Sequence, residues 1–299
     1  MWILLAVCSS IFLGIYDVFR KKSLENNAVL PVLFISTLTG ALIFLPFILL
    51  STFAKQYFAD NFFFVPYSGY GVQKFIFLKA MLVVSSWICT FFAFKHLPLT
   101  IGSPIRSTAP LWTLLGALTF LGESLSTLQW IGLIISLVFF FAFSIAGKND
   151  GFSFGKNKWI WFMIVGTLLG ATSGLYDKYL IKRFDKMEVQ AWYSIYQVVV
   201  MAPIIYFLWY PRRKATTPFQ WKNNIPMIAI CLVIADFAYF YALSLPGALI
   251  SVISIVRRAN VIISFTAGVL IFKERKNIRS KAFLLLGILS GVVIMYWGS

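Results

Sequence analysis

The stretch SPIRSTAPLWTLLGALTFLGES (residues 103–124) returns 151 positions later as SIVRRANVIISFTAGVLIFKER (254–275). Each copy carries arginine inside a long apolar run. A shorter pair of matching stretches supports the repeat, because GIYD at 14–17 returns as GLYD at 174–177. The second half of the chain therefore repeats the first half, and the fold is expected to consist of two related units.

The composition indicates that these units lie in a membrane. Of the 299 residues, 60% are hydrophobic and only 12% are charged, and the mean hydropathy is +0.84. A soluble fold of this length needs a more polar surface. A transmembrane helix needs about 20 consecutive apolar residues. Ten candidate spans meet this requirement: 1–19, 29–50, 75–95, 98–121, 127–146, 159–181, 188–210, 225–244, 247–272 and 281–297.

The number of spans in each half determines how the halves are oriented. Because each repeat contains five spans, the two repeats cross the membrane in opposite senses, which is an inverted repeat typical of transporters. We therefore predict an all-α membrane protein with ten transmembrane helices as two inverted five-helix repeats. The first repeat covers 1–146, the connecting loop 147–158 and the second repeat 159–299.

Lysine and arginine residues are distributed unequally between the two sides. The odd-numbered loops carry 16 of them, whereas the even-numbered loops with their helix ends carry 7. The positive-inside rule then places the odd loops in the cytoplasm and both termini outside, in a multi-pass protein of the cell (inner) membrane. The net charge of +16 is assigned to these loops and to contacts with anionic membrane lipids, so no nucleic-acid partner is expected.

Several charged residues fall inside the apolar spans. A central arginine costs roughly 2.5–3.5 kcal/mol on membrane-insertion scales, so each one needs a partner or a watery cavity. One interpretation is an internal set of ion pairs, and the other is that some of the bases bind an anionic solute. The charges concerned are Arg106, Arg257, Arg258, Asp17, Asp177 and Asp236.

The substrate-binding candidates combine the deep charges with their polar and aromatic neighbours. Ser254, Arg257 and Asn260 lie on one side of a helix. Arg106 is expected to face Arg257 across the repeat axis, where two guanidinium groups repel each other when the site is empty and clamp a phosphate or carboxylate when it is filled. The full set is Arg106, Arg257, Arg258, Asp236, Ser103, Ser254, Asn260, Tyr239 and Trp87.

The repeated GIYD and GLYD stretches supply the gating or coupling candidates. Asp17 and Asp177 are either proton-coupling acids or members of helix-end ion pairs with Arg20 and Lys178. Tyr16 and Tyr176 beside them either line the cavity or lie among the aromatic residues of the membrane interface. No metal site and no cofactor is expected.

Several motifs resemble the drug/metabolite transporter superfamily and its ten-helix EamA branch. They are AFKHLP (93–98), LGESLS (121–126), ALSLP (242–246) and FKERKN (272–277), together with the paired five-helix halves. The resemblance covers nearly the whole chain and implies a transporter. Members of that branch usually keep both termini in the cytoplasm, which is opposite to the orientation that the loop charges indicate.

The intramembrane bases are also similar to those of the triose-phosphate translocator branch of the same superfamily. In that branch a basic residue on the fourth helix and a basic pair on the ninth helix bind the phosphate of the substrate. Arg106 and the pair Arg257 and Arg258 occupy matching positions, with arginine at both lysine sites. The resemblance therefore implies that these three residues contact an anion.

These observations predict a secondary active transporter that moves a phosphate- or carboxylate-bearing anion or a zwitterion by alternating access. The alternative is an exporter of amino acids or amphipathic cationic metabolites or drugs, with Asp236 as the attracting charge. No ATPase motif or catalytic motif is present in the sequence, so we expect no enzyme activity. The partners are then a small-molecule substrate, membrane lipids, and coupling protons or a counter-substrate.

The predicted orientation can be tested with reporters fused after Ser299. Alkaline phosphatase is expected to be active and a fluorescent protein dark, because both termini lie outside in this orientation. Fluorescence from the fusion and inactive phosphatase would reverse the orientation and leave the repeat unaffected.

Overall fold

The computed structural model describes residues 2–121, 126–149, 156–246, 248, 250, 253, 256, 257, 259–274 and 277–298. Two of the predicted site residues, Ser254 and Arg258, lie outside the described residues. The described part of the chain is helical, as the sequence predicts. Its helices are α1 (Trp2–Leu24), α2 (Val29–Phe53), α3 (Lys55–Phe58), α4 (Tyr70–His96), α5 (Leu99–Ser107), α6 (Ala109–Leu121), α7 (Thr127–Asn149), α8 (Lys158–Ile181), α9 (Lys186–Ile204), α10 (Asn224–Ser244), α12 (Asn260–Leu270) and α13 (Ile278–Trp297).

Six of the described helices are long and apolar enough to cross a membrane on their own. They are α1, α2, α4, α8, α10 and the helix that begins with α9 and continues through a π-helical turn (Ile205–Trp209) to Arg212. Shorter apolar helical segments at Trp130–Phe139 and Asn260–Leu270 fall within other predicted spans.

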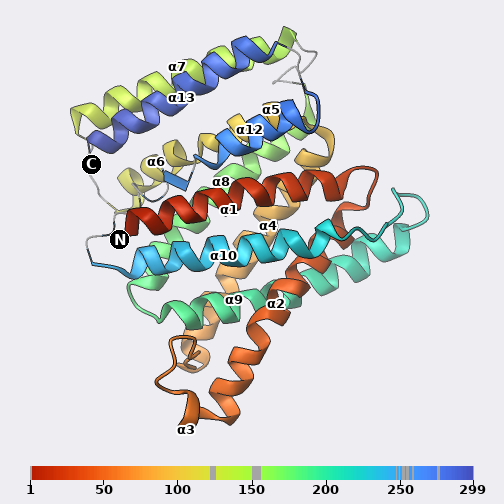
Figure 1. Cartoon of the computed structure of the whole chain (residues 1–299), viewed down its shortest axis with the longest axis vertical. Coiled ribbons are helices and arrows are strands. Elements are labelled where there is room, and N and C mark those ends of the chain that lie inside the picture. Colours follow the sequence, from red (N-terminus) through yellow and green to blue (C-terminus); the bar gives the residue numbers. More distant parts are fainter. Residues whose placement is uncertain are drawn as a thin grey trace.

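The helix packing has the two-fold pattern of an inverted repeat. The helix α1 packs on α10, and its repeat mate α8 packs in the same way on α4, the mate of α10. The helix α4 also contacts α9, just as α10 contacts α2. Two pairs of mates contact each other directly, α2 with α9 and α7 with α13, and Figure 1 shows α7 and α13 side by side along one edge of the bundle. The predicted all-α architecture of two inverted repeats is confirmed.

The fourth predicted span is not one continuous helix. The span predicted over 98–121 is helical, but it is interrupted by a turn at Thr108 between α5 and α6. Proline at position 110 has no backbone N–H to donate to the carbonyl of residue 106, which interrupts the helical hydrogen bonds. The chain turns again at Ala259, just before α12 and 151 positions later. Both copies of the repeated stretch are therefore broken at the same place.

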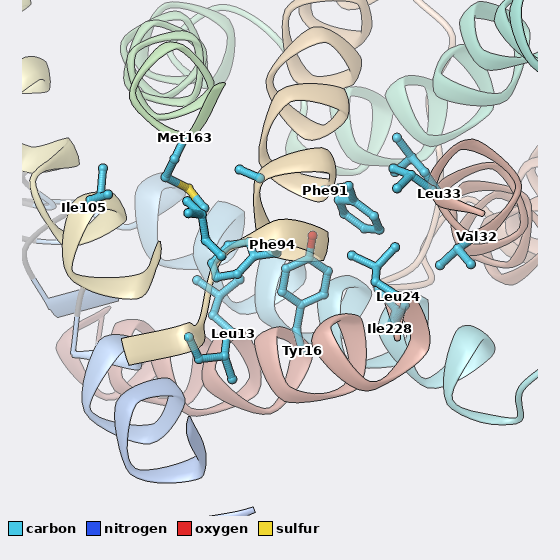
Figure 2. Packing of buried hydrophobic residues seen from close by; sticks show 14 of the residues in the cluster. Leu13, Tyr16, Leu24, Val32, Leu33, Phe91, Phe94, Ile105, Met163 and Ile228 are labelled. Carbon is cyan, nitrogen blue, oxygen red and sulfur yellow. The ribbon is translucent and has the colours of Figure 1, made fainter. Parts of the chain in front are cut away.

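Aromatic and aliphatic side chains fill the interior between the halves. Figure 2 shows Tyr16 pointing from α1 toward Phe91 and Phe94 of α4, with Leu13 beside it. All four side chains are at most 5% exposed. Because Tyr16 is this deeply buried, it is part of the core and does not lie at the membrane interface.

The small residues of the repeated GIYD and GLYD stretches have different surroundings. A Cβ atom added to Gly14 would lie 2.6 Å from Cβ of Ile263 on α12, whereas a Cβ added to the equivalent Gly174 would meet no atom within 4 Å. The close approach that a glycine permits between helices is therefore used in the first repeat and not in the second.

This difference predicts unequal effects of the same substitution. Gly14→Ala is expected to destabilise the protein by about 1–3 kcal/mol, because Ile263 or its helix must move. Gly174→Ala is the matched control and should be neutral or slightly stabilising, since alanine favours a helix over glycine. Thermal unfolding of both variants in detergent measures the difference. Equal melting temperatures would contradict the packing described for α1 and α12.

Candidate functional site

A cavity of about 140 Å³ lies between the two halves of the bundle. An engineered cavity of similar size, about 150 Å³, binds benzene, so a solute of comparable size fits here. Elements of both repeats form its wall, which includes small residues of α8 such as Gly170 and Gly174. Its charged and aromatic lining residues are Lys79, Arg106, Asp177, Asp236, Arg257, Tyr16, Trp87, Tyr193, Tyr239 and Phe240.

One group of charges surrounds Asp17 of α1. Its Oδ1 atom accepts from Arg20 Nη2 at 2.5 Å and from Arg106 Nη1 at 2.8 Å. Its Oδ2 atom accepts from Asn260 Nδ2 at 3.1 Å and from Ser264 Oγ at 2.9 Å. Both oxygens of this buried carboxylate are thus satisfied by charged or polar donors, as a charge in a low-dielectric interior requires.

Arg20 has no contact with solvent and is held by aromatic side chains as well as by Asp17. Its guanidinium carbon lies 4.0 Å from the ring centroid of Phe94 and 4.8 Å from that of Tyr16. Such cation–π contacts stabilise a desolvated guanidinium by roughly 2 kcal/mol. The sequence-based expectation that Asp17 pairs with Arg20 is therefore met.

A second group of charges lies on α4, α8, α10 and the segment before α12. Lys79 of α4 forms an ion pair with Asp177 of α8. Arg257 donates from Nη2 to Asp236 Oδ1 at 2.9 Å, and its guanidinium carbon lies 4.0 Å from the ring centroid of Tyr239. Asp236 also accepts from the hydroxyl of Tyr193 at 2.8 Å.

The balance of charge differs between the two groups. The first group has two bases and one acid, whereas the second has two bases and two acids. Among the described residues, one positive charge at the cavity therefore remains uncompensated. It belongs to the group that contains Arg106, the most exposed member, with 20% of its side-chain surface accessible compared with 2% for Asp17.

Most of the sequence-predicted residues meet at this cavity, and some do not. Arg106, Arg257, Asp236, Tyr239, Trp87, Tyr16 and Asp177 line it. Asn260 is not among the lining residues and donates a hydrogen bond to Asp17. Ser103 is buried in α5, and its hydroxyl has no partner within the described residues. Tyr176 points elsewhere and donates to the carbonyl of Phe75 at 3.3 Å.

The arrangement of the two arginines differs from the expectation of unpaired guanidinium groups that repel each other. Arg106 and Arg257 line the same cavity, but each one already binds a carboxylate. The internal ion pairs that the sequence suggested are thus present. Arg257 also has a buried Nε–H group that has no partner among the described residues.

Sequence reasoning missed Lys79 and Tyr193. Lys79 is one of the seven bases of the even-numbered loops and their helix ends, but its side chain is buried and it lies within α4. It carries the same signal that identified Arg106, a single base within an apolar span. Tyr193 has no comparable signal, because one tyrosine among many aromatic residues does not indicate a partner.

Hydrogen bonds between the two repeats close the bundle at the ends of α1 and α4. Asn27 and Gln220 bond each other reciprocally at 2.7 and 2.8 Å, and Lys222 donates to the carbonyl of Glu25 at 2.6 Å. Glu274 accepts from the backbone N–H groups of Leu99 and Thr100, the first two residues of α5. A carboxylate at a helix N-terminus satisfies N–H groups that lack an intrahelical partner.

Comparison with known proteins gives a family and a fold. The model of the EamA-like transporter family matches the chain twice, at residues 1–145 and 157–297. No curated protein matches the sequence. Among the solved structures, a crystal structure of a protein superposes with a TM-score of 0.59 over 96% of each chain at 13% identity, which shows a shared fold alone.

The Asp17 contacts predict that this carboxylate stabilises the bundle. Asp17→Ala would leave the buried cation of Arg20 without its ion-pair partner, which typically costs about 3–5 kcal/mol. Asp60→Ala is the control, because Asp60 is exposed. Thermal unfolding in detergent should show a large loss for the first variant and little change for the second. Equal stability of the two variants would mean that the Asp17 contacts contribute nothing.

Proposed function

The chain belongs to the EamA-like transporter family, and we propose that it is a secondary active transporter of a small organic anion or zwitterion bearing a phosphate or carboxylate. The solute would bind in the central cavity and cross the membrane by alternating access. The absence of an ATPase motif from the sequence favours coupling to protons or to a counter-substrate.

The uncompensated positive charge at the cavity carries this proposal. Because Arg20, Asn260 and Ser264 already satisfy Asp17, the charge of Arg106 is available to a solute. A bound anion would compensate this surplus positive charge, which is costly to leave unpaired in a buried site. The helix α6 begins at Ala109 in the cavity wall, so the positive end of its dipole adds to the attraction.

Arg257 supplies the second contact in this proposal. Its place in the cavity wall would let its guanidinium group donate to an anion that Arg106 also holds. The planar guanidinium group suits carboxylate and phosphate oxygens. Trp87 and Tyr239 would contact the apolar part of the solute.

The alternative, export of a cationic metabolite attracted by Asp236, has less support. The carboxylate of Asp236 is bound by Arg257 and Tyr193, and Asp177 is bound by Lys79. A cation entering the cavity would have to displace one of these bases and would also meet the surplus positive charge. An amino acid remains compatible with the site through its carboxylate, as a zwitterion.

We place the transporter in the cell (inner) membrane with the odd loops in the cytoplasm and the termini outside. Burial of Arg20 and Lys281 removes two bases from the odd loops, and burial of Lys79 removes one from the even loops. The bias toward the odd loops therefore persists. The remaining loop bases would contact anionic lipid headgroups.

A thermal-shift screen of the purified protein tests the class of solute. Phosphorylated, carboxylated and cationic metabolites are compared at equal concentration and ionic strength. A ligand that binds the folded state raises the melting temperature, and we expect anions and zwitterions to do so. Stabilisation by cations alone would overturn the proposal in favour of the cationic alternative.

Substitution of Arg106 tests the binding contact. Arg106→Ala should fold, because Asp17 keeps its other three donors, but the affinity for the anion found in the screen should fall roughly 10- to 100-fold, since a charge-assisted hydrogen bond contributes about 1.5–3 kcal/mol. Arg106→Lys should restore only part of the affinity, because an ammonium group cannot make a two-pronged contact.

Isothermal titration and the melting temperature of the same variants separate binding from stability. Lys55→Ala removes an exposed base outside the cavity and serves as the control. The same pair of measurements applies to Arg257→Ala. A large fall in melting temperature with unchanged affinity would mean that the arginine only holds the bundle together.

A further inference from the structure

The two repeats use equivalent charges in different ways. In the first repeat Asp17 is bound to Arg106 at 2.8 Å. The equivalent residues of the second repeat are Asp177 and Arg257, and they are bound to other partners. Asp177 pairs with Lys79, and Arg257 pairs with Asp236.

These other partners have no charged counterpart in the opposite repeat. The helices α4 and α10 align at an offset of 149, which places Trp87 opposite Asp236 and Ile228 opposite Lys79. Lys79 and Asp236 are therefore additions to the repeated pattern. In the conformation described here, Lys79 is the ion-pair partner of Asp177, and Asp236 is that of Arg257.

The four charged residues of these two ion pairs lie close together at the cavity. The Lys79 ammonium lies 4.8 Å from the ring centroid of Tyr193, whose hydroxyl donates to Asp236. Lys79, Asp177, Asp236 and Arg257 all line the same cavity. Exchange of partners among these four groups therefore needs only local movement.

From this arrangement we infer that the four charges exchange partners during transport. In the state described here the pairs are Lys79–Asp177 and Arg257–Asp236, and in the opposite state they are Arg257–Asp177 and Lys79–Asp236. The inference rests on the proposed alternating access. When two inverted repeats exchange conformations, the opening moves to the other side of the membrane, so the second repeat takes up the pairing that the first repeat now has.

Both pairings leave every member of the set compensated, so neither state has the cost of an unpaired buried charge. In the opposite state the ion pair between Asp17 and Arg106 can break. Asp17 is still compensated then, because it keeps Arg20 as a charged partner. An element with two such arrangements is bistable, and a solute can bias it through Arg257.

The exchange should be visible at the end of the bundle that the two repeats close. Glu25 and Trp221 are exposed there, on either side of the contact between Lys222 and the carbonyl of Glu25. Spin labels on cysteines at these two positions would report whether this end is closed or open. The native cysteines Cys8, Cys89 and Cys231 are first replaced by alanine.

Two matched double variants isolate the two pairings. In Lys79→Met/Asp177→Asn, Arg257 has only Asp236 as a partner within the set. In Lys79→Met/Asp236→Asn it has only Asp177. Both variants lose one base and one acid, so their net charges are equal. Distances are measured by pulsed electron paramagnetic resonance in lipid nanodiscs without added solute.

We expect the first variant to give a single distribution at the short distance of the closed end. The second variant should move most of the distribution to longer distances. Identical distributions would overturn the inference. It would also be overturned if the second variant failed to fold while the first was monodisperse, because Arg257 would then be unable to reach Asp177. The readout needs no solute, so this result is independent of whether the cavity binds anions.

Discussion

The carboxylate of Asp17 fixes three parts of the interior relative to one another. It is bound by Arg20 of its own helix, by Arg106 of α5 and by Asn260 and Ser264 of α12. In a low-dielectric interior, these donors together offset the cost of burying the carboxylate. The helices α1, α5 and α12 are therefore held in one arrangement, and the cavity forms beside it.

The breaks in the two repeated stretches make this arrangement possible. If the helix continued through Thr108, the backbone N–H and C=O groups near Arg106 would all be used in intrahelical hydrogen bonds. Because the chain turns at Thr108 and again at Ala259, two helix ends face the middle of the bundle. Irregular backbone at membrane depth is tolerated where protein surrounds it or where it lines a cavity. The backbone groups at these helix ends thus place partial charges next to the charged side chains.

Much of the fold could be predicted from the sequence, because composition and the repeat depend on local patterns. The site was predicted in part. Arg106 and Arg257 stand out as bases in apolar runs, but their acidic partners come from helices that meet only in the folded bundle. Lys79 carries the same signal, but it lies near enough to the start of its predicted span to resemble a helix-end charge. Proline at position 110 signals the first break, whereas the break at Ala259 follows from the repeat and has no proline of its own.

The buried charges are divided unequally between the repeats, with a consequence for how such a chain can be assembled. In the two charged groups at the cavity, the first repeat contributes Arg20, Lys79, Arg106 and Asp17, and the second contributes Arg257, Asp177 and Asp236. Two copies of the first half would bring together an excess of bases, and two copies of the second an excess of acids. Neither half can therefore replace the other in an antiparallel homodimer. Because the two halves are joined in one polypeptide, they are always present in the one-to-one ratio that their complementary charges require.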